Sequence, residues 1–205
     1  MNDYSLLLKM IPKNTEKIML FLLKNIGEFG HNINQISKLN SISVGSAFKI
    51  LKELEKNKIV LKKNINNSSN YKLNLDNYEA IKLCELLLLG EKRKLKGYAK
   101  IYADEIIKFE QADLIILFGS VLKKDDFNDV DALFVTNTNQ VKKVNDFCLD
   151  ISKVKTKPVV PLILRQDDLI NEIKQKNESI LGMIKNSVVL KGESVFLEVI
   201  KNVNS

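Results

Sequence analysis

The sequence of 205 residues predicts a mixed α/β (α+β) fold in two domains, residues 1–90 and 97–205. In the first domain, helical hydrophobic spacing is followed by two strands of alternating polarity, whereas helices and strands alternate throughout the second. Charge also differs: residues 1–95 contain 16 Lys and Arg against 9 Asp and Glu, and residues 96–205 contain 16 of each kind. The whole formal charge of +7 therefore lies in the first half, which indicates either a polyanionic partner there or a solvated, lysine-rich surface.

Composition and cysteine usage exclude several classes of protein. No run of 18 uncharged apolar residues occurs, so we expect no membrane span, and the start of the chain is broken by Pro12, which is not typical of a signal peptide. Cys84 and Cys148 lie in apolar helical patterns, without Cys or His neighbours at metal-ligand spacing. We therefore expect buried, reduced thiols in a cytoplasmic protein, and neither a disulfide framework nor a zinc site.

Helical spacing of apolar residues predicts three helices in the first domain, over residues 14–27, 32–39 and 43–57. Asn14 or Thr15 can cap the first helix and Gly27 can end it, and Ser43 is the expected N-cap of the third. Residues 40–42 are expected to form a tight connection. The apolar side chains at helical spacing are expected in the core: Ile18, Phe21, Leu22, Ile26, Ile33, Ile36, Leu39, Val44, Ala47, Phe48, Leu51 and Leu54.

Two segments of alternating polarity, residues 58–63 and 71–75, predict a β-hairpin whose Asn- and Ser-rich tip spans 64–70. Three helices followed by such a hairpin resemble a winged helix-turn-helix domain of archaeal and bacterial regulators, over residues 14–76. The segment SVGSAFKILKELEKNKIV resembles the recognition helix and first wing strand of that family, and YKLN resembles the returning strand. The resemblance implies a domain that binds duplex DNA, although winged helices also serve as protein dimerisation modules.

Polar residues of the third helix and the first strand are the candidate DNA contacts: Ser43, Ser46, Lys49, Lys52, Lys62 and Lys63. A helix face that carries small hydroxyl groups and lysines can enter the major groove, and the strand lysines can reach the flanking phosphates. The third helix has no Arg, so bidentate recognition of guanine is not expected. The alternative is that these lysines form a solvated face without a partner.

A very apolar helical pattern follows the hairpin. Its apolar residues at helical spacing are Ala80, Ile81, Cys84, Leu87 and Leu88. This helix carries more apolar residues than a lone surface helix needs, which predicts either a homodimer interface or a helix that joins the two domains. The charged segment from Gly90 to Gly97 is the expected domain boundary.

The second domain is expected to form a layered structure with a small mixed sheet. The elements predicted in order are a helix after Lys96, strands at 114–118 and 129–135, a helix at 139–153, a strand at 159–164, a helix at 168–185, a strand at 188–190 and a helix from Glu193. The residues suited to chemistry lie where the first of these strands ends and the second begins.

Two short motifs occupy those strand ends. Gly119 and Ser120 directly follow the first strand, where a glycine lets the backbone approach a ligand and the hydroxyl and turn amides can hold phosphate oxygens. Asp129 and Asp131 begin the second strand and, being two residues apart, project from the same face. Two neighbouring carboxylates in an apolar strand repel each other and lose hydration, and a divalent cation such as Mg²⁺ relieves both costs.

The segment LIILFGSVLKKDDFNDVDALFV, residues 114–135, resembles the polymerase-beta-like nucleotidyltransferase superfamily, especially the minimal nucleotidyltransferases. Lys123 occupies the place of a basic residue in that family, and together with Lys124 it can neutralise triphosphate charge. The later segment ILGMIKNSVVLKGESVF resembles the end of archaeal members that join a winged helix to such a domain. The resemblance implies that the aspartate pair holds Mg²⁺ or Mn²⁺, and that Gly119, Ser120 and Lys123 bind a nucleoside triphosphate.

The family also places a third carboxylate on a neighbouring strand, to complete two metal sites, and here the sequence departs from it. The strand expected at 159–164 is apolar, and Asp167 and Asp168 beyond it are expected to cap the next helix. Asp125 and Asp126, in the loop before the aspartate pair, are other candidates for the third carboxylate.

Two functions remain open. In the first, the chain transfers a nucleoside monophosphate from a nucleoside triphosphate to a hydroxyl of a protein or nucleic acid. In the second, it is a DNA-binding regulator, or an antitoxin-like protein, whose second domain only binds a nucleotide or a partner. Minimal nucleotidyltransferases often pair with a separate helical protein, so a toxin-type helical partner is also a candidate. The single His31 is expected in a loop of the first domain and offers no general base to the second.

Overall fold

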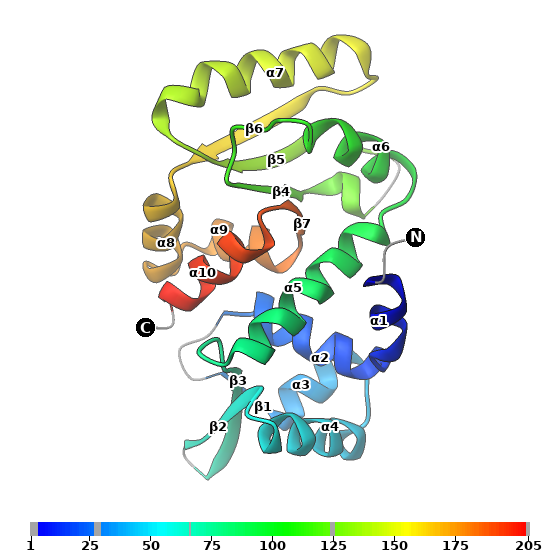
Figure 1. The fold of residues 1–205 in the computed structure, drawn as a ribbon, viewed down its shortest axis with the longest axis vertical. Helices are drawn as coiled ribbons and strands as arrows, with labels where there is room; N and C mark the ends of the chain where they lie inside the picture. Colours follow the sequence, from blue (N-terminus) through cyan, green and yellow to red (C-terminus); the bar gives the residue numbers. More distant parts are fainter. Residues whose placement is uncertain (1–3, 27–29, 66, 124–125, 204–205) are drawn as a thin grey trace. The chain divides into compact units, whose positions relative to one another are not determined.

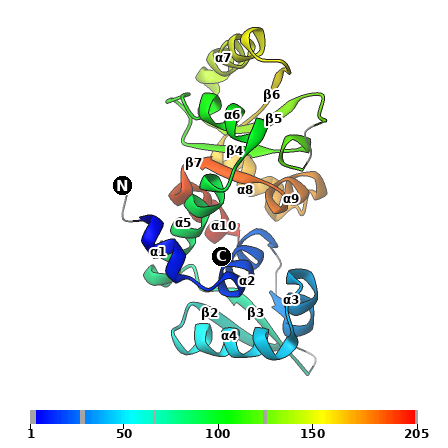
Figure 2. The ribbon, with the colours of Figure 1, turned by 90° about the vertical axis from the view of Figure 1, so that its right-hand side faces the viewer.

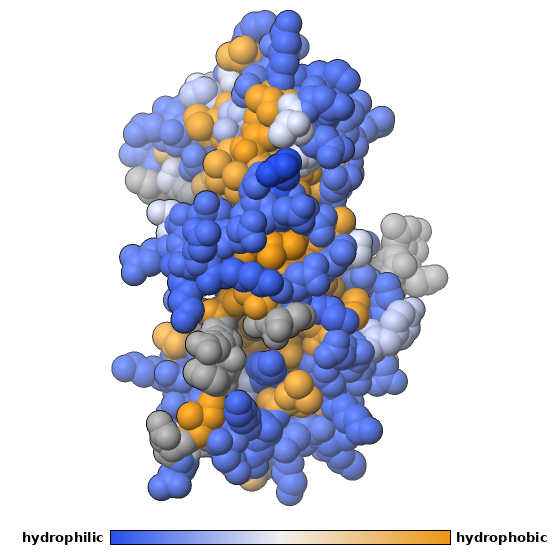
Figure 3. Space-filling view, turned by 90° about the vertical axis from the view of Figure 1, so that its left-hand side faces the viewer, coloured by the Kyte–Doolittle hydropathy of each residue, from blue (hydrophilic) through white to orange (hydrophobic). Residues whose placement is uncertain are grey.

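The computed structural model describes residues 4–26, 30–65, 67–123 and 126–203, which form an α+β structure with two small sheets (Figure 1). The chain divides into two compact units: unit 1 ends at Gly90, and unit 2 runs from Glu91 to Val203. Among the described residues, none of the helices has the length and the hydropathy that a membrane crossing requires. Polar residues cover most of the face seen in Figure 3, and small hydrophobic areas interrupt them.

Unit 1 contains a helical layer and a three-stranded antiparallel sheet of order β1-β3-β2. Its helices are α1 (Tyr4–Met10), α2 (Lys13–Lys24), α3 (Ile33–Asn40), α4 (Val44–Lys56) and the first turns of α5 (Tyr78–Arg93). Its strands are β1 (His31–Asn32), β2 (Val60–Ile65) and β3 (Ser68–Leu73). Helices α2, α3 and α4 pack on one another and on the hairpin, and their shared core contains Ile18, Met19, Leu22, Leu23, Ile36, Ala47 and Leu51.

Of the helix caps predicted for unit 1, the one of α4 is present and the one of α2 is not. Ser43 caps α4 as predicted, because its Oγ accepts a hydrogen bond from the Ser46 amide at 3.2 Å. The predicted cap of α2 by Asn14 or Thr15 is wrong. Pro12 occupies the N-cap position, where its missing N–H costs nothing, and α2 ends at Lys24. The predicted stop at Gly27 lies outside the described residues.

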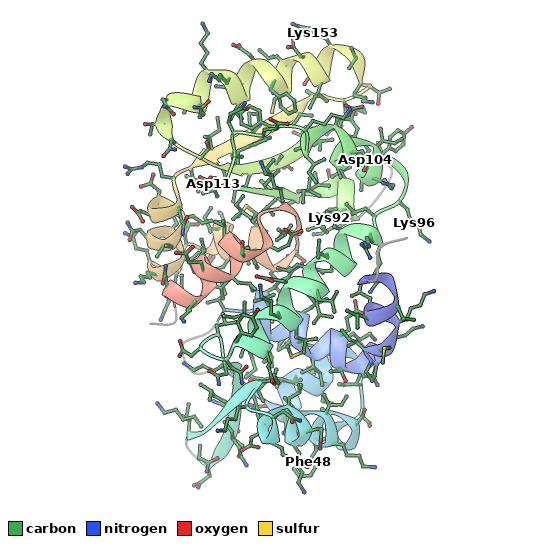
Figure 4. All side chains as sticks on the ribbon, in the orientation of Figure 1. Phe48, Lys92, Lys96, Asp104, Asp113 and Lys153 are labelled. Atoms are coloured by element: carbon green, nitrogen blue, oxygen red, sulfur yellow. The ribbon has the colours of Figure 1, made fainter. Side chains whose placement is uncertain are left out.

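Three side chains predicted for the core are exposed instead. Leu39, Val44 and Phe48 keep 58%, 47% and 52% of their surface accessible, and Phe48 lies on the outer side of α4 (Figure 4). Only a narrow stripe of α4, centred on Ala47 and Leu51, packs inward. Helical spacing identifies neighbours on a helix, but the width of the stripe that is covered depends on the elements packed against it.

The hairpin is tighter than predicted. β2 and β3 pair from Val60 opposite Leu73 to Ile65 opposite Ser68, so most of the expected tip is strand. Polar residues there still bond across the strands, since Ser69 Oγ donates to Asn64 Oδ1 at 2.8 Å. The loop predicted around His31 is wrong as well: β1 pairs with β3, and the His31 ring contacts Phe21 edge-on with Nε2 2.8 Å from the Asn25 carbonyl.

Helix α5 continues past Gly90 to Arg93, so the break predicted between Gly90 and Gly97 is shorter than expected. Asn77 starts the helix by accepting from the Glu79 and Ala80 amides. In the last turn, Lys92 (Figure 4) donates to the Leu190 carbonyl at 2.8 Å and to Glu193 at 3.0 Å within unit 2. Four of the five apolar residues predicted for a dimer or joining helix are buried: Ala80, Cys84, Leu87 and Leu88. The homodimer stays a prediction.

Unit 2 contains a mixed sheet of order β6-β5-β4-β7, in which only β5 and β6 run parallel. The strands are β4 (Leu114–Phe118), β5 (Val130–Val135), β6 (Val159–Leu164) and β7 (Val188–Lys191). The helices are α6 (Gly97–Ile106), α7 (Val141–Val154), α8 (Gln166–Lys174), α9 (Glu178–Lys185) and α10 (Glu193–Val203), with short 3₁₀ helices η1 (Ser120–Leu122) and η2 (Thr138–Gln140). Figures 1 and 2 show α6 and α7 on one side of the sheet and α8, α9 and α10 on the other.

Most predicted elements of unit 2 are present, and one prediction is wrong. The helix expected at 168–185 is two helices, because the chain turns at Lys176, whose φ is +57°. Asn177 then caps α9 by accepting from the Ser179 amide. Both cysteines are free and buried as predicted, and burial raises the pKa of the Cys84 and Cys148 thiols to about 12.

Candidate functional site

The Gly-Ser turn at the end of β4 depends on a backbone conformation that glycine alone adopts readily. Gly119 has φ +85° and ψ −159°, a region in which a Cβ is strained. A Cβ at this position would also collide with the Asp131 carboxylate. Ser120 then begins η1, which closes with the Lys123 amide donating to the Ser120 carbonyl at 2.9 Å. The sequence motif therefore corresponds to direct packing of the turn on the second aspartate.

The two aspartates lie together at the start of β5. Asp131 is opposite Phe118 in the antiparallel ladder, and Asp129 directly precedes the strand. Between them, buried Val130 donates its amide to the Pro158 carbonyl at 2.9 Å, which fixes the start of the strand. Burial, and then the negative charge of Asp129, raise the pKa of the Asp131 carboxyl above its usual value. The lost hydration of Asp131 and its repulsion by Asp129 both favour a cation beside the two carboxylates.

Phe127, which the sequence motifs do not single out, anchors the chain just before the aspartates. Phe127 is buried, and its ring makes edge contacts with Tyr98 at 5.5 Å and Tyr102 at 6.1 Å between centroids. It precedes Asp129 by two residues, so its burial limits where the aspartate can move. A single aromatic residue within the charged stretch DDFND was the available signal.

The strand next to the aspartate pair presents an apolar residue where a third ligand would lie. β5 and β6 are parallel, and Asp131 is in register with Val160. Paired residues of neighbouring strands point to the same face, so Val160, 44% exposed, is the nearest β6 side chain to the Asp131 carboxylate. Among the residues described, no group of three or more His, Cys, Asp or Glu side chains is placed to hold a metal ion. The described part of the site thus offers two carboxylates.

The other acidic candidates that the structure describes do not complete the site. Asp167 and Asp168 lie inside the first turn of α8, and Arg165 occupies the N-cap position, so the predicted capping role is wrong. Asp168 instead forms a two-pronged ion pair with Arg165, at 2.8 Å for both contacts, which lowers the pKa of its carboxyl. Asp126 is exposed, and Asp125 lies outside the described residues.

Lys123, which was predicted to bind the nucleotide, lies in unit 2, and the residues predicted to bind DNA lie in unit 1. Lys123 is exposed directly after η1, and Lys124 lies outside the described residues. In unit 1, Lys49 and Lys52 are exposed on α4, whereas Ser46 is half-buried and the Ser43 oxygen serves as the helix cap. Lys62 and Lys63 are both exposed on β2 but, as consecutive residues of a strand, they point to opposite faces of the hairpin.

Comparison with known proteins identifies no relative. The chain matches no protein-family model, and neither the curated proteins nor the solved structures give a significant match. The function proposed below therefore rests on the site geometry and on the two sequence motifs.

The conformation of Gly119 leads to a stability prediction. Gly119→Ala should lower the free energy of unfolding by about 1–3 kcal/mol, because alanine is strained at this φ and ψ and its Cβ meets Asp131. Gly182→Ala is the matched control, since a Cβ there would meet no described atom within 4 Å in helix α9. That control should stabilise the chain by roughly 0.5–1 kcal/mol. Urea denaturation measures both, and equal stability of the two variants would contradict the Gly119 geometry.

Proposed function

We propose that unit 2 is a nucleotidyltransferase domain and unit 1 a winged helix-turn-helix domain that binds duplex DNA. One observation carries the first assignment: Gly119, in a conformation that favours glycine, packs its backbone on Asp131. The Gly-Ser turn and the Asp129–Asp131 pair, ten residues apart in sequence, therefore form one structural unit. Phosphate-holding amides next to a carboxylate pair are the groups that a nucleotide with its metal ion requires.

Each residue of the site has a distinct role in this proposal. The amides of the turn and the Ser120 hydroxyl hold phosphate oxygens of a nucleoside triphosphate, and exposed Lys123 offsets their charge. Asp129 and Asp131 hold Mg²⁺ or Mn²⁺, which supplies charge neutralisation for the phosphates and the departing pyrophosphate. Phe127 is buried against Tyr98 and anchors the chain two residues before Asp129. The reaction is transfer of a nucleoside monophosphate to a hydroxyl of a protein or nucleic acid.

The DNA-binding assignment is supported by the arrangement of unit 1. α3 and α4 are joined through Ser41, whose φ of +54° makes the tight turn, and the β2–β3 hairpin follows α4 directly. This order of helices and hairpin supports the winged-helix assignment. The excess positive charge of the chain lies in residues 1–95, and the exposed face of α4 carries Lys49 and Lys52.

Val160 favours a second candidate, in which unit 2 binds a nucleotide without transferring it. With an apolar residue in register with Asp131, the pair provides ligands for one cation more readily than for two. The chain would then be a DNA-binding regulator that responds to a nucleotide, or an antitoxin-like protein that binds a helical partner.

Pyrophosphate release separates the two candidates. With labelled nucleoside triphosphates and Mg²⁺, the wild-type chain should release pyrophosphate, and Asp129→Ala/Asp131→Ala should not. Asp146→Ala/Asp150→Ala, which removes two exposed aspartates of α7, is the control and should behave as the wild type. If the wild type binds the nucleotide without turnover and the Asp129/Asp131 variant does not bind it, the regulator is the correct function. If neither protein binds the nucleotide, the transferase and the nucleotide-responsive regulator are both refuted, and only the antitoxin-like, partner-binding role is left.

A further inference from the structure

The exposed face of α4 is apolar at its N-terminal end, where the sequence predicted core residues. Val44 and Phe48 are about half exposed and stand four residues apart, so their side chains are neighbours on the helix. Lys52 follows one further turn along the same side, and Lys49 lies next to Phe48. Figure 4 shows Phe48 directed away from the body of unit 1.

Gly45 adds a second unusual feature to this surface. It is exposed in the first turn of α4, and a Cβ there would meet no described atom within 4 Å, so no packing contact with the described residues requires glycine. Glycine is a poorer helix former than alanine, by up to about 1 kcal/mol in a helix interior. A ligand that approaches the helix backbone closely would account for this cost, because glycine leaves room for it.

The charge of this face selects the class of ligand. The N-terminal half of α4 carries Lys49 and no acidic residue, whereas in its C-terminal half Lys52 and Lys56 are offset by Glu53 and Glu55. A polyanion is therefore attracted more strongly to the N-terminal half. An aromatic ring on such a surface needs an apolar group on the polyanion, and duplex DNA offers one in its major groove, the C5 methyl group of thymine.

The lack of arginine in α4 limits how this helix can recognise base pairs. The chain contains Arg only at 93 and 165, so α4 has no arginine for the two-pronged recognition of guanine. Apolar contact is the way in which Val44 and Phe48 themselves can distinguish base pairs. In helix-turn-helix proteins the N-terminal residues of the second helix reach the base edges, which is where Val44 and Phe48 lie.

We propose that Phe48, with Val44, recognises thymine methyl groups in the major groove, so that the chain selects A·T pairs where α4 meets the DNA. This inference rests on the DNA-binding role proposed for unit 1. It makes Phe48 a specificity-determining residue, whereas Lys49 and Lys52 contribute to affinity for any duplex through the phosphates.

The test replaces thymine by uracil, which lacks only the methyl group. Duplexes that bind the full-length chain are first selected from a random pool and then synthesised with deoxyuridine in place of thymidine. Wild-type affinity, measured by fluorescence anisotropy, should fall about fourfold for each contacted methyl group lost, which corresponds to about 0.8 kcal/mol. Phe48→Ala should bind both duplexes with nearly equal affinity, and Phe48→Leu should retain part of the preference.

Two further variants test whether the effect is specific to this surface. Leu149→Ala truncates a side chain of α7 that is 58% exposed, and should leave the thymine preference unchanged. Gly45→Ala should raise the thermal stability of the free chain but weaken binding to the selected duplex. The melting curve of each variant shows whether it is folded, so a loss of thymine preference that is caused by unfolding is identified.

The possible results separate thymine recognition by Phe48 from the DNA-binding role of unit 1 on which it rests. Equal wild-type affinity for the thymine and uracil duplexes would overturn the role of Phe48 while leaving DNA binding intact. Binding to no duplex would overturn both. If instead wild type sediments as a dimer that Phe48→Ala dissociates, with no change in thymine preference, the apolar surface is a protein interface and the inference is wrong.

Discussion

Replacing Val160 with aspartate should tighten Mg²⁺ binding to unit 2 by on the order of 10- to 100-fold, since even an outer-shell partner of a metal ligand contributes this much. The parallel register places residue 160 beside Asp131, on the same face of the sheet. A carboxylate there joins the pair formed by Asp129 and Asp131. Val160 is 44% exposed, so an aspartate at this position remains partly hydrated and the fold should tolerate it.

The same variant should accelerate pyrophosphate release with nucleoside triphosphate and Mg²⁺, because three carboxylates can position two metal ions. Titration calorimetry with Mg²⁺ and Mn²⁺ measures the binding, and a coupled phosphate assay measures the rate. The matched control is Val154→Asp, which places the same charge on an exposed apolar position of α7 and should change neither quantity. Val160→Asp with unaltered metal affinity would mean that Asp131 is not a metal ligand.

Removing four lysines should have the second large effect, on the salt dependence of DNA binding. For the variant Lys49→Ala/Lys52→Ala/Lys62→Ala/Lys63→Ala we expect a smaller slope of log affinity against log salt, by about 0.9 for each lysine that contacts a phosphate. Lys62 and Lys63 point to opposite faces of the hairpin, so one of the two should contact the DNA, and the variant should lose about three phosphate contacts in all. Affinity at low salt should fall at least tenfold.

A control with the same change in charge separates local contacts from net charge. Lys142, Lys143, Lys174 and Lys185 are exposed in unit 2, and their replacement by alanine lowers the charge of the chain equally. That variant should keep the wild-type slope. Electrophoretic mobility shifts between 50 and 200 mM salt, a range over which phosphate contacts weaken strongly, provide the measurement. Equal slopes for the two variants would argue against the predicted DNA face.

Several predictions from the sequence that depended only on neighbouring residues are confirmed by the structure. Ser43 caps α4 because a cap is made by a side chain and an amide three residues on. The strand at 159–164 matches β6 because a short apolar run bounded by polar residues is a local pattern. At the start of α2 two local signals competed, a polar cap at Asn14 and the restricted backbone of Pro12. The proline decided where the helix begins.

The sequence by itself determined an α+β chain with a basic first half and a Gly-Ser turn ahead of an aspartate pair. Only the tertiary structure decided which groups meet. Phe48 is exposed because the width of the covered stripe of α4 depends on the helices packed against it. Val160 lies beside Asp131 because strand register is set by pairing between segments about 30 residues apart, which no local pattern encodes. The contact of Gly119 with Asp131 likewise exists only once β4 and β5 are paired.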